Sequence, residues 1–185
     1  MAKQPAIFLD RDGVINQDGD YVCSVDDFHF IDGSIEAMQA LKQKGWLLVV
    51  VTNQSGIARG YFSEDDFLAL TEWMDWSLVD RGVTLDGIYY CPHHPDFGQG
   101  DYRQVCDCRK PEPGMFLQAA NELDIDLANS WMIGDKASDL LGAKRAEIAH
   151  RILVKSGKEV TEQAKELAES IVDDLSAAAK LILAK

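Results

Sequence analysis

Short, mostly apolar runs alternate along this chain with segments in which apolar residues recur at helical spacing. The runs cover residues 6–9, 46–51, 86–91, 130–133 and 151–154, and such short runs are typical of strands buried on both faces of a parallel sheet. Helices are expected to begin near Ser34, Ser63, Pro113, Ser138, Thr161 and Asp173, with a short edge strand at 170–172. This alternation, without linker or repeat, predicts one α/β domain over residues 1–185: a Rossmann-like parallel sheet with helices on both faces.

The composition is that of an ordinary globular protein, with 46% hydrophobic and 26% charged residues. The formal net charge of −13 argues against a nucleic-acid or anionic-membrane surface, but it leaves room for one small cationic pocket. No apolar run has the length of a membrane span, and the first residues show no signal-peptide pattern. We therefore expect a cytoplasmic protein, acting as a monomer on a small molecule, with no nucleic-acid or membrane partner.

The first predicted strand ends in two acids, Asp10 and Asp12, followed by Gly13. Residues i and i+2 of a strand point the same way, so both carboxylates can enter one pocket at the carboxyl end of the sheet. Two carboxylates so close repel each other unless a cation lies between them or one is protonated. The pair therefore predicts a Mg²⁺ site with a nucleophile and a general acid. The alternative is an ordinary turn residue after a strand.

Further polar residues follow the other predicted strands. Thr52 and Asn53 follow the second strand, Arg109 and Lys110 precede Pro111, and Gly134-Asp135 begins a Gly-Asp-x-x-x-Asp pattern that ends at Asp139. These four motifs, in this order, resemble those of the haloacid dehalogenase superfamily, and the match covers nearly the whole chain.

The resemblance assigns a phosphatase mechanism to these residues. Asp10 would attack phosphorus to give an aspartyl-phosphate, and Asp12 would act as general acid and base. Thr52 and Lys110 would hold the phosphoryl oxygens. Asp10, Asp135 and the backbone carbonyl of Asp12 would bind Mg²⁺. Asp139 is left between two roles: it supports Lys110 or a water on Mg²⁺, or it only bonds the start of its own helix.

A second metal site is predicted in the long loop before Lys110. Cys91 and His93 form one close pair, and Cys106 and Cys108 form another. Three sulfurs and one imidazole complete tetrahedral coordination of Zn²⁺ with no open position, so the zinc would be structural. The sequence by itself leaves open whether His93 or His94 is the ligand. The zinc loop, residues 91–108, would hold Arg109 and Lys110 at the pocket.

The additional cap domains of larger superfamily members need room between Gly13 and Thr52 or between Thr52 and Lys110. Core elements and the zinc loop fill both gaps, so a capless enzyme is expected. Its open mouth would be lined by the segments 18–27, 53–60 and 92–109. Zinc-bearing capless members fall into two branches, heptose bisphosphate phosphatases of lipopolysaccharide-core precursor synthesis and histidinol-phosphate phosphatases. The segments TNQSGIARG, DGDYV and LDGIYYCPHHP are similar to the heptose branch.

This resemblance implies a sugar bisphosphate as substrate. Arg109 is the predicted partner of the second phosphate because a guanidinium can fork onto two of its oxygens. The predicted substrate-binding residues are Asp18, Gly19, Asp20, Tyr21, Thr52, Asn53, Gln54, Ser55, Arg59, Arg109, Lys110 and Lys136. The alternative from another class, a zinc-stabilised binding module without activity, is disfavoured because no catalytic motif residue is replaced.

Overall fold

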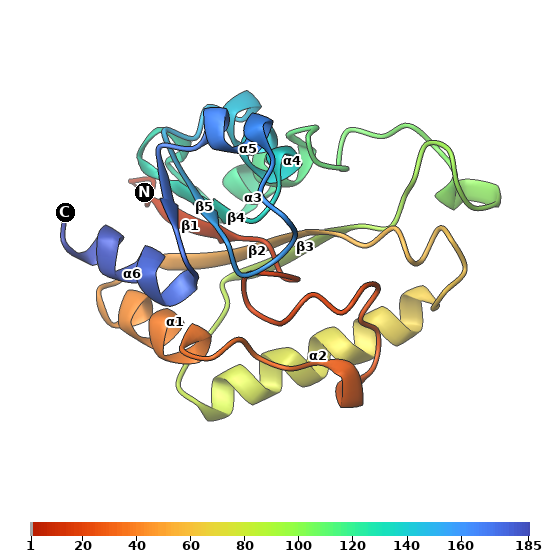
Figure 1. Ribbon diagram of the computed structural model, residues 1–185, viewed down its shortest axis with the longest axis horizontal. Coiled ribbons are helices and arrows are strands. Elements are labelled where there is room, and N and C mark those ends of the chain that lie inside the picture. The colour runs from red at the N-terminus through yellow and green to blue at the C-terminus, as the bar shows by residue number, and fades with distance from the viewer. Residues whose placement is uncertain (1) are drawn as a thin grey trace.

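The computed structural model describes residues 2–185 and contains a six-stranded, fully parallel sheet (Figure 1). The strand order is β3-β2-β1-β4-β5-β6, which places β1 at the centre. The strands are β1 (Ala6–Leu9), β2 (Leu47–Asn53), β3 (Gly87–Cys91), β4 (Trp131–Gly134), β5 (His150–Val154) and β6 (Ser170–Val172). The helices are α1 (Ser34–Gln43), α2 (Glu64–Asp80), α3 (Gly114–Leu123), α4 (Ala137–Arg145), α5 (Glu162–Leu167) and α6 (Leu175–Leu183).

Alternating residues of the central strand feed two hydrophobic cores. Ile7 and Leu9 pack on one face of the sheet, against apolar residues of α1, α2 and α6. Ala6 and Phe8 pack on the opposite face, against α3, α4 and α5. All four residues are fully buried, which explains why this strand reads as an unbroken apolar run. The two helical layers lie above and below the sheet in Figure 1, and the predicted architecture is confirmed.

The helix boundaries agree with the sequence at most positions. Ser63 accepts a hydrogen bond from the Asp66 N–H and completes a capping box at α2, and Thr161 caps α5. The prediction that Ser138 caps the fourth helix was wrong. Helix α4 begins one residue earlier, and the Asp139 side chain accepts the backbone N–H of Lys136 instead.

The chain between β3 and α3 is long and irregular, as expected, apart from one 3₁₀ turn at Gly100–Tyr102. In Figure 1 this segment extends away from the sheet toward the start of α2. Within residues 2–185, none of the helices is long and apolar enough to cross a membrane.

Candidate active site

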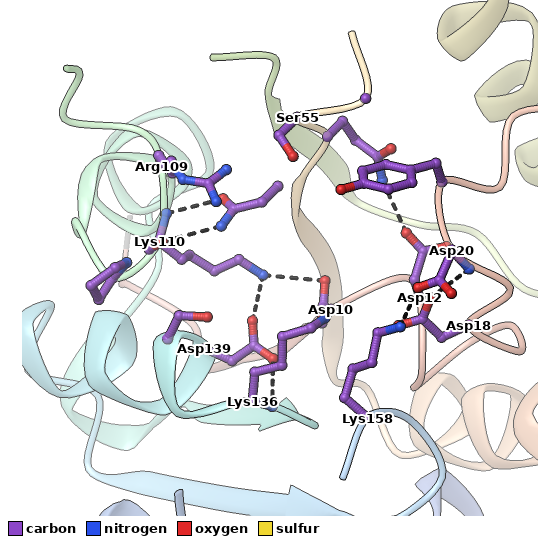
Figure 2. Close-up of a pocket in the computed structure, with 16 residues that line it drawn as sticks. Asp10, Asp12, Asp18, Asp20, Ser55, Arg109, Lys110, Lys136, Asp139 and Lys158 are labelled. Carbon is purple, nitrogen blue, oxygen red and sulfur yellow. Dashed lines mark hydrogen bonds and ion pairs between the residues drawn. The ribbon is translucent and has the colours of Figure 1, made fainter. Parts of the chain in front are cut away.

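A pocket of about 420 Å³ lies at the carboxyl ends of the central strands (Figure 2). Its lining residues come from segments that are far apart in the sequence: Asp10, Asp12, Asp18, Asp20, Tyr21, Asn53, Gln54, Ser55, Gly56, Arg109, Lys110, Pro111, Lys136, Ser138, Asp139 and Lys158. Parallel strands deliver these segments to one edge of the sheet, where open α/β sheets bind ligands.

The base of the pocket is a buried ionic group around Lys110. The Nζ atom of Lys110 lies 3.2 Å from Asp10 Oδ1 and 2.7 Å from Asp139 Oδ1. Burial opposes the charge on Asp10, but Lys110 and Lys136 outweigh it and hold the pKa of Asp10 below its ordinary value. Burial likewise opposes the charge on Lys110, yet Asp10 and Asp139 keep its pKa raised. The nucleophile candidate is therefore ionised and carries its own buried counter-ion.

The position of Lys110 is fixed from its backbone as well as its side chain. Its N–H donates to Asn53 Oδ1 (3.0 Å), and Asn53 Nδ2 donates to the carbonyl of Lys110 (3.1 Å). The ammonium group also donates to the carbonyl of Val51 (2.8 Å). Asn53, predicted as a substrate-binding residue, thus also joins the end of β2 to the residues that directly follow the zinc loop.

Asp139 performs both of the roles that the sequence left open. Its Oδ1 pairs with Lys110, while its Oδ2 accepts the backbone N–H groups of Asp135 (3.1 Å) and Lys136 (3.2 Å). Burial and the nearby charge of Asp10 raise the pKa of Asp139 despite Lys110. One carboxylate therefore caps α4 and orients the lysine.

Asp135 is fully buried beside Asp10 and Asp139, and carboxylate oxygens of the three lie within 4.8 Å of one another. Burial, followed by the charges of Asp10 and Asp139, raises the pKa of Asp135 to about 8. A Cβ at Gly13 would lie 2.5 Å from Asp135 Oδ2, and one at Gly157 only 2.1 Å, so both positions must lack a side chain. Crowded carboxylates with too few donors fit a hard divalent cation such as Mg²⁺.

Asp12 lies on the other side of the pocket from Lys110 (Figure 2). Its carboxylate accepts hydrogen bonds from Arg11, Asn16 and Gln54. Gln54 Nε2 also donates to the hydroxyl of Thr52 (2.9 Å). Thr52 is buried and does not itself line the pocket. Gln54 thereby links the two residues that were predicted to act on the leaving group and on the phosphoryl oxygens.

The four predicted zinc ligands lie together, with one donor atom of each within 4.8 Å of the others. Cys91 Sγ lies 2.8 Å from Cys108 Sγ, and His93 Nδ1 lies 3.4 Å from Cys108 Sγ. The neighbouring thiol of Cys91 lowers the pKa of Cys108 to about 5, whereas Cys108 and burial raise that of Cys91. Such crowding of sulfurs fits a metal ion that takes thiolates as ligands.

The structure distinguishes the two histidines. His94 Nδ1 accepts the backbone N–H groups of Asp96 (3.0 Å) and Phe97 (3.2 Å), so it is engaged in a turn of its own loop. His93 is the histidine in the cysteine cluster, a choice that the sequence by itself left open.

Most of the predicted substrate-binding residues do line the pocket, but Gly19, Thr52 and Arg59 do not. The guanidinium carbon of Arg59 lies 4.0 Å from the ring centroid of Phe97, a stacked cation–π geometry. Arg59 therefore holds the cysteine-rich loop against the segment that follows β2.

Two charged residues escaped the sequence interpretation. Lys158 lines the pocket and forms ion pairs with Asp18 (3.6 Å) and Asp20. Lys158 follows β5. The rule that ligands bind at the carboxyl ends of strands would have identified it if the rule had also been applied to the fifth predicted strand. Arg11 stands between the two motif acids in the sequence and is buried.

The comparisons with known proteins agree with this geometry. The HAD-hydrolase-like family matches residues 107–178. A protein of Pasteurella multocida (strain Pm70), D-glycero-beta-D-manno-heptose-1,7-bisphosphate 7-phosphatase, is 63% identical over 177 residues, which is 96% of each chain. The Escherichia coli (strain K12) protein of the same name is 58% identical, covering 95% of this chain and 93% of its own.

Solved structures point the same way. The D,D-heptose 1,7-bisphosphate phosphatase of B. bronchiseptica, complexed with magnesium and phosphate, has a TM-score of 0.83 at 36% identity and covers 98% of this chain and 99% of its own. The D,D-heptose 1,7-bisphosphate phosphatase of Burkholderia thailandensis has a TM-score of 0.69 at 28% identity, covering 98% and 100%. The chain belongs to the haloacid dehalogenase-like hydrolases and, within them, to the heptose-1,7-bisphosphate phosphatase family.

Proposed function

We propose that this protein removes the 7-phosphate of D-glycero-β-D-manno-heptose 1,7-bisphosphate, a step in making heptose precursors of lipopolysaccharide. The observation that carries the proposal is the buried Asp10–Lys110 pair at the base of an open pocket. Relatives at 56–63% identity bear the name of this activity, and they favour it over hydrolysis of histidinol phosphate.

The chemistry assigned to the pocket has two steps. Asp10 attacks phosphorus, and the bond to the sugar oxygen breaks as Asp12 gives that oxygen a proton. Water then forms a bond to phosphorus and gives a proton to Asp12, and the bond to Asp10 breaks. Lys110 and Thr52 stabilise the charge on the phosphoryl oxygens.

Mg²⁺ is the cofactor that the acids at the base of the pocket fit, and the B. bronchiseptica relative was solved with it. Asp10, Asp135 and the Asp12 carbonyl would hold the ion, which neutralises phosphoryl charge when bound. We assign Zn²⁺ to Cys91, His93, Cys106 and Cys108, where a closed donor set gives it a structural role.

Recognition of the rest of the substrate falls to cations around the mouth. Arg109 and Lys136 both line the pocket, and Lys136 Nζ lies 3.8 Å from Asp10 Oδ2. We assign Lys136 to the phosphate that is cut and Arg109 to the distal one. The site as assigned uses no residue of a second subunit, and we propose that the protein acts as a monomer. The net charge of −13 supports a small-molecule substrate over a nucleic acid.

Steady-state kinetics with Mg²⁺ on heptose 1,7-bisphosphate and on histidinol phosphate test the proposal. We expect a much higher kcat/KM for the bisphosphate, release of heptose 1-phosphate, and loss of activity in EDTA. A preference for histidinol phosphate would overturn the substrate, and turnover that needs no divalent cation would overturn the mechanism.

The variant Asp10→Asn tests the nucleophile. An amide cannot form the acyl-phosphate, so phosphate release should fall to background while the far-UV circular dichroism stays that of the wild type, because Lys110 keeps Asp139 as its partner. The matched control is Asp80→Asn, at the exposed end of α2, which should keep full activity. Turnover by Asp10→Asn above background would refute this role.

A further inference from the structure

Arg11 is a buried arginine that the chemistry described so far does not use. Only 1% of its surface is exposed. Its guanidinium carbon lies 5.7 Å from the ring centroids of both Phe28 and Phe67, so two aromatic side chains flank it. Burying a charge is costly unless it is paired and hydrogen-bonded, and an arginine with no role beyond packing would be replaced by an apolar side chain at little cost.

Most hydrogen bonds of the buried Arg11 guanidinium go to Asp12. Nε donates to Asp12 Oδ1 (3.1 Å), and Nη2 donates to both Oδ1 (2.8 Å) and Oδ2 (3.1 Å). Nη2 also donates to the carbonyl of Val22 (3.0 Å), and Nη1 has no hydrogen-bond partner within the described part of the chain. The backbone N–H of Arg11 donates to Asp10 Oδ1 (2.9 Å). One residue thus contacts both motif acids.

These donors treat the two oxygens of Asp12 unequally. Oδ1 receives three N–H groups at 2.8–3.1 Å, from Arg11 Nε, Arg11 Nη2 and Asn16 Nδ2. Oδ2 receives two longer contacts, from Arg11 Nη2 (3.1 Å) and Gln54 Nε2 (3.2 Å). Oδ2 therefore has fewer and longer hydrogen bonds than Oδ1, which makes it the oxygen better able to exchange a proton with a ligand in the pocket.

We propose that Arg11 is the positioning residue for proton transfer: it fixes the Asp12 carboxyl so that Oδ2 delivers the proton to the leaving oxygen. The proposal rests on the phosphatase function above. In the first step the proton leaves Oδ2 as the bond between phosphorus and the leaving oxygen breaks. In the second step Oδ2 takes a proton from the water that bonds to phosphorus. The Arg11 side chain acts through Asp12 and does not itself give or take the proton.

Three features make arginine specific for this task. The planar fork matches two carboxylate oxygens, whereas an ammonium is a point charge that fixes no orientation. Phe28 and Phe67 prevent the guanidinium from swinging aside. The bond to the Val22 carbonyl ties it to the segment that carries Asp18, Asp20 and Tyr21 to the pocket.

Substrates whose leaving groups differ in their need for a proton distinguish this positioning role from a purely structural one. A nitrophenolate leaves without a proton, whereas a poorly stabilised phenolate or an alkoxide needs one. We would measure kcat/KM, which covers the steps up to departure of the leaving group, for p-nitrophenyl, phenyl and p-methoxyphenyl phosphate. Arg11→Lys keeps the charge and loses the fork. The kcat/KM of this variant should fall by less than about threefold on p-nitrophenyl phosphate and by about tenfold or more on p-methoxyphenyl phosphate.

Two controls complete the experiment. Arg81→Lys makes the same change at an exposed arginine that pairs with Glu36 and should alter neither rate. In an Asp12→Asn background, Arg11→Lys should add no further dependence on the leaving group, because the group it positions is gone. The aryl series does not need the heptose substrate, so failure of the substrate assignment would leave this test intact.

Equal losses of kcat/KM on the three aryl phosphates would overturn the proposal. So would an effect of Arg11→Lys in the Asp12→Asn background that depends on the leaving group as strongly as it does in the wild-type background. If Arg11→Lys does not fold, Arg11→Gln is tested in the same series with the same expectation. Failure of both variants to fold would assign Arg11 to the fold and contradict the proposal.

Discussion

At the scale of single residues, buried charge at the base of the pocket is balanced by a small number of cations. Lys110 is flanked by Asp10 and Asp139, and Lys136 approaches Asp10 and Asp135 from the mouth. The Lys136 side chain is 40% exposed, whereas that of Lys110 is almost completely buried. Lys110 is therefore fixed before substrate arrives, and Lys136 keeps the freedom to turn toward a phosphate.

Arg109 is the residue where we expect substrate choice to reside. Within residues 2–185 its guanidinium makes one long hydrogen bond, to the carbonyl of His93 (3.5 Å), so it can reach a ligand in the pocket. Losing a charge-assisted contact costs roughly 1.5–3 kcal/mol, or about one to two decades in kcat/KM. Arg109→Ala should lower kcat/KM for heptose 1,7-bisphosphate by that amount.

A monophosphate without the distal group should lose far less in Arg109→Ala. Arg103→Ala, at an exposed arginine of the same loop that does not line the pocket, provides the matched control. Equal losses on the bisphosphate and the monophosphate would mean that Arg109 serves the reacting phosphate or the fold.

At the scale of elements, the end of β3 and the zinc loop (residues 91–108) are both bound to the start of α2. The hydroxyls of Tyr90 and Tyr102 both donate to the carboxylate of Glu64, at 2.5 and 2.8 Å. These bonds lower the pKa of Glu64, while burial and Glu64 raise the pKa of Tyr90 to about 12. The first turn of α2 also favours an acidic residue, because its free N–H groups carry partial positive charge.

The lowered pKa of Glu64 predicts a pH-dependent contribution to stability. A carboxyl whose folded pKa lies below its unfolded value stabilises the fold above about pH 4.5, and this contribution is lost as the pH falls through the folded pKa. Glu64→Gln should therefore lower the free energy of unfolding by about 1 kcal/mol at neutral pH. Urea unfolding of both proteins at descending pH measures the difference, which should vanish in acid. A difference that does not change with pH would contradict the ionic role.

The cysteine cluster should stabilise the same loop through its metal. The free energy of metal binding at a structural site contributes to folding. Cys106→Ser or chelation of the metal should therefore lower the melting temperature and reduce the free energy of unfolding by about 2 kcal/mol or more. Cys23→Ser is the control, because Cys23 lies outside the cluster. Metal analysis should find zinc in the wild type and in Cys23→Ser. Absence of zinc from carefully purified wild-type protein would refute the assignment.

At the scale of the whole molecule, the parallel sheet gathers acids that destabilise one another until a cation binds. Asp135 has an ordinary pKa near 3.8 when unfolded and one of about 8 when folded without metal. The folded state then binds the extra proton, so the stability of the metal-free protein should fall as the pH rises from about 4 to about 8.

Mg²⁺ competes with that proton, so it should stabilise the protein more at about pH 8 than at about pH 6. A ligand at a hundred times its dissociation constant adds about 2.7 kcal/mol, a shift that thermal unfolding resolves. Asp135→Asn should lose most of the Mg²⁺-dependent rise in melting temperature. An equal rise in Asp135→Asn and wild type would place the ion elsewhere.

The sequence by itself determined the features that local pattern encodes. Buried parallel strands read as short apolar runs, and the rule that polar groups gather at their carboxyl ends located Asp10, Asp12, Asn53 and Asp135 before any coordinates. Two close pairs of Cys and His residues predicted the cluster of Cys91, His93, Cys106 and Cys108, because chelating pairs lie near each other in the chain.

Only the tertiary structure decided what depends on contacts between distant segments. Lys110 meets Asp10 across 100 positions, and Lys158 meets Asp20 across 138. Local spacing carries no signal for such pairs, because folding around the sheet brings them together. The same holds for Arg11. Its place between two acids was visible in the sequence, but its burial between Phe28 and Phe67, which turns a charged neighbour into a fixed fork on Asp12, arises only when three separate segments pack.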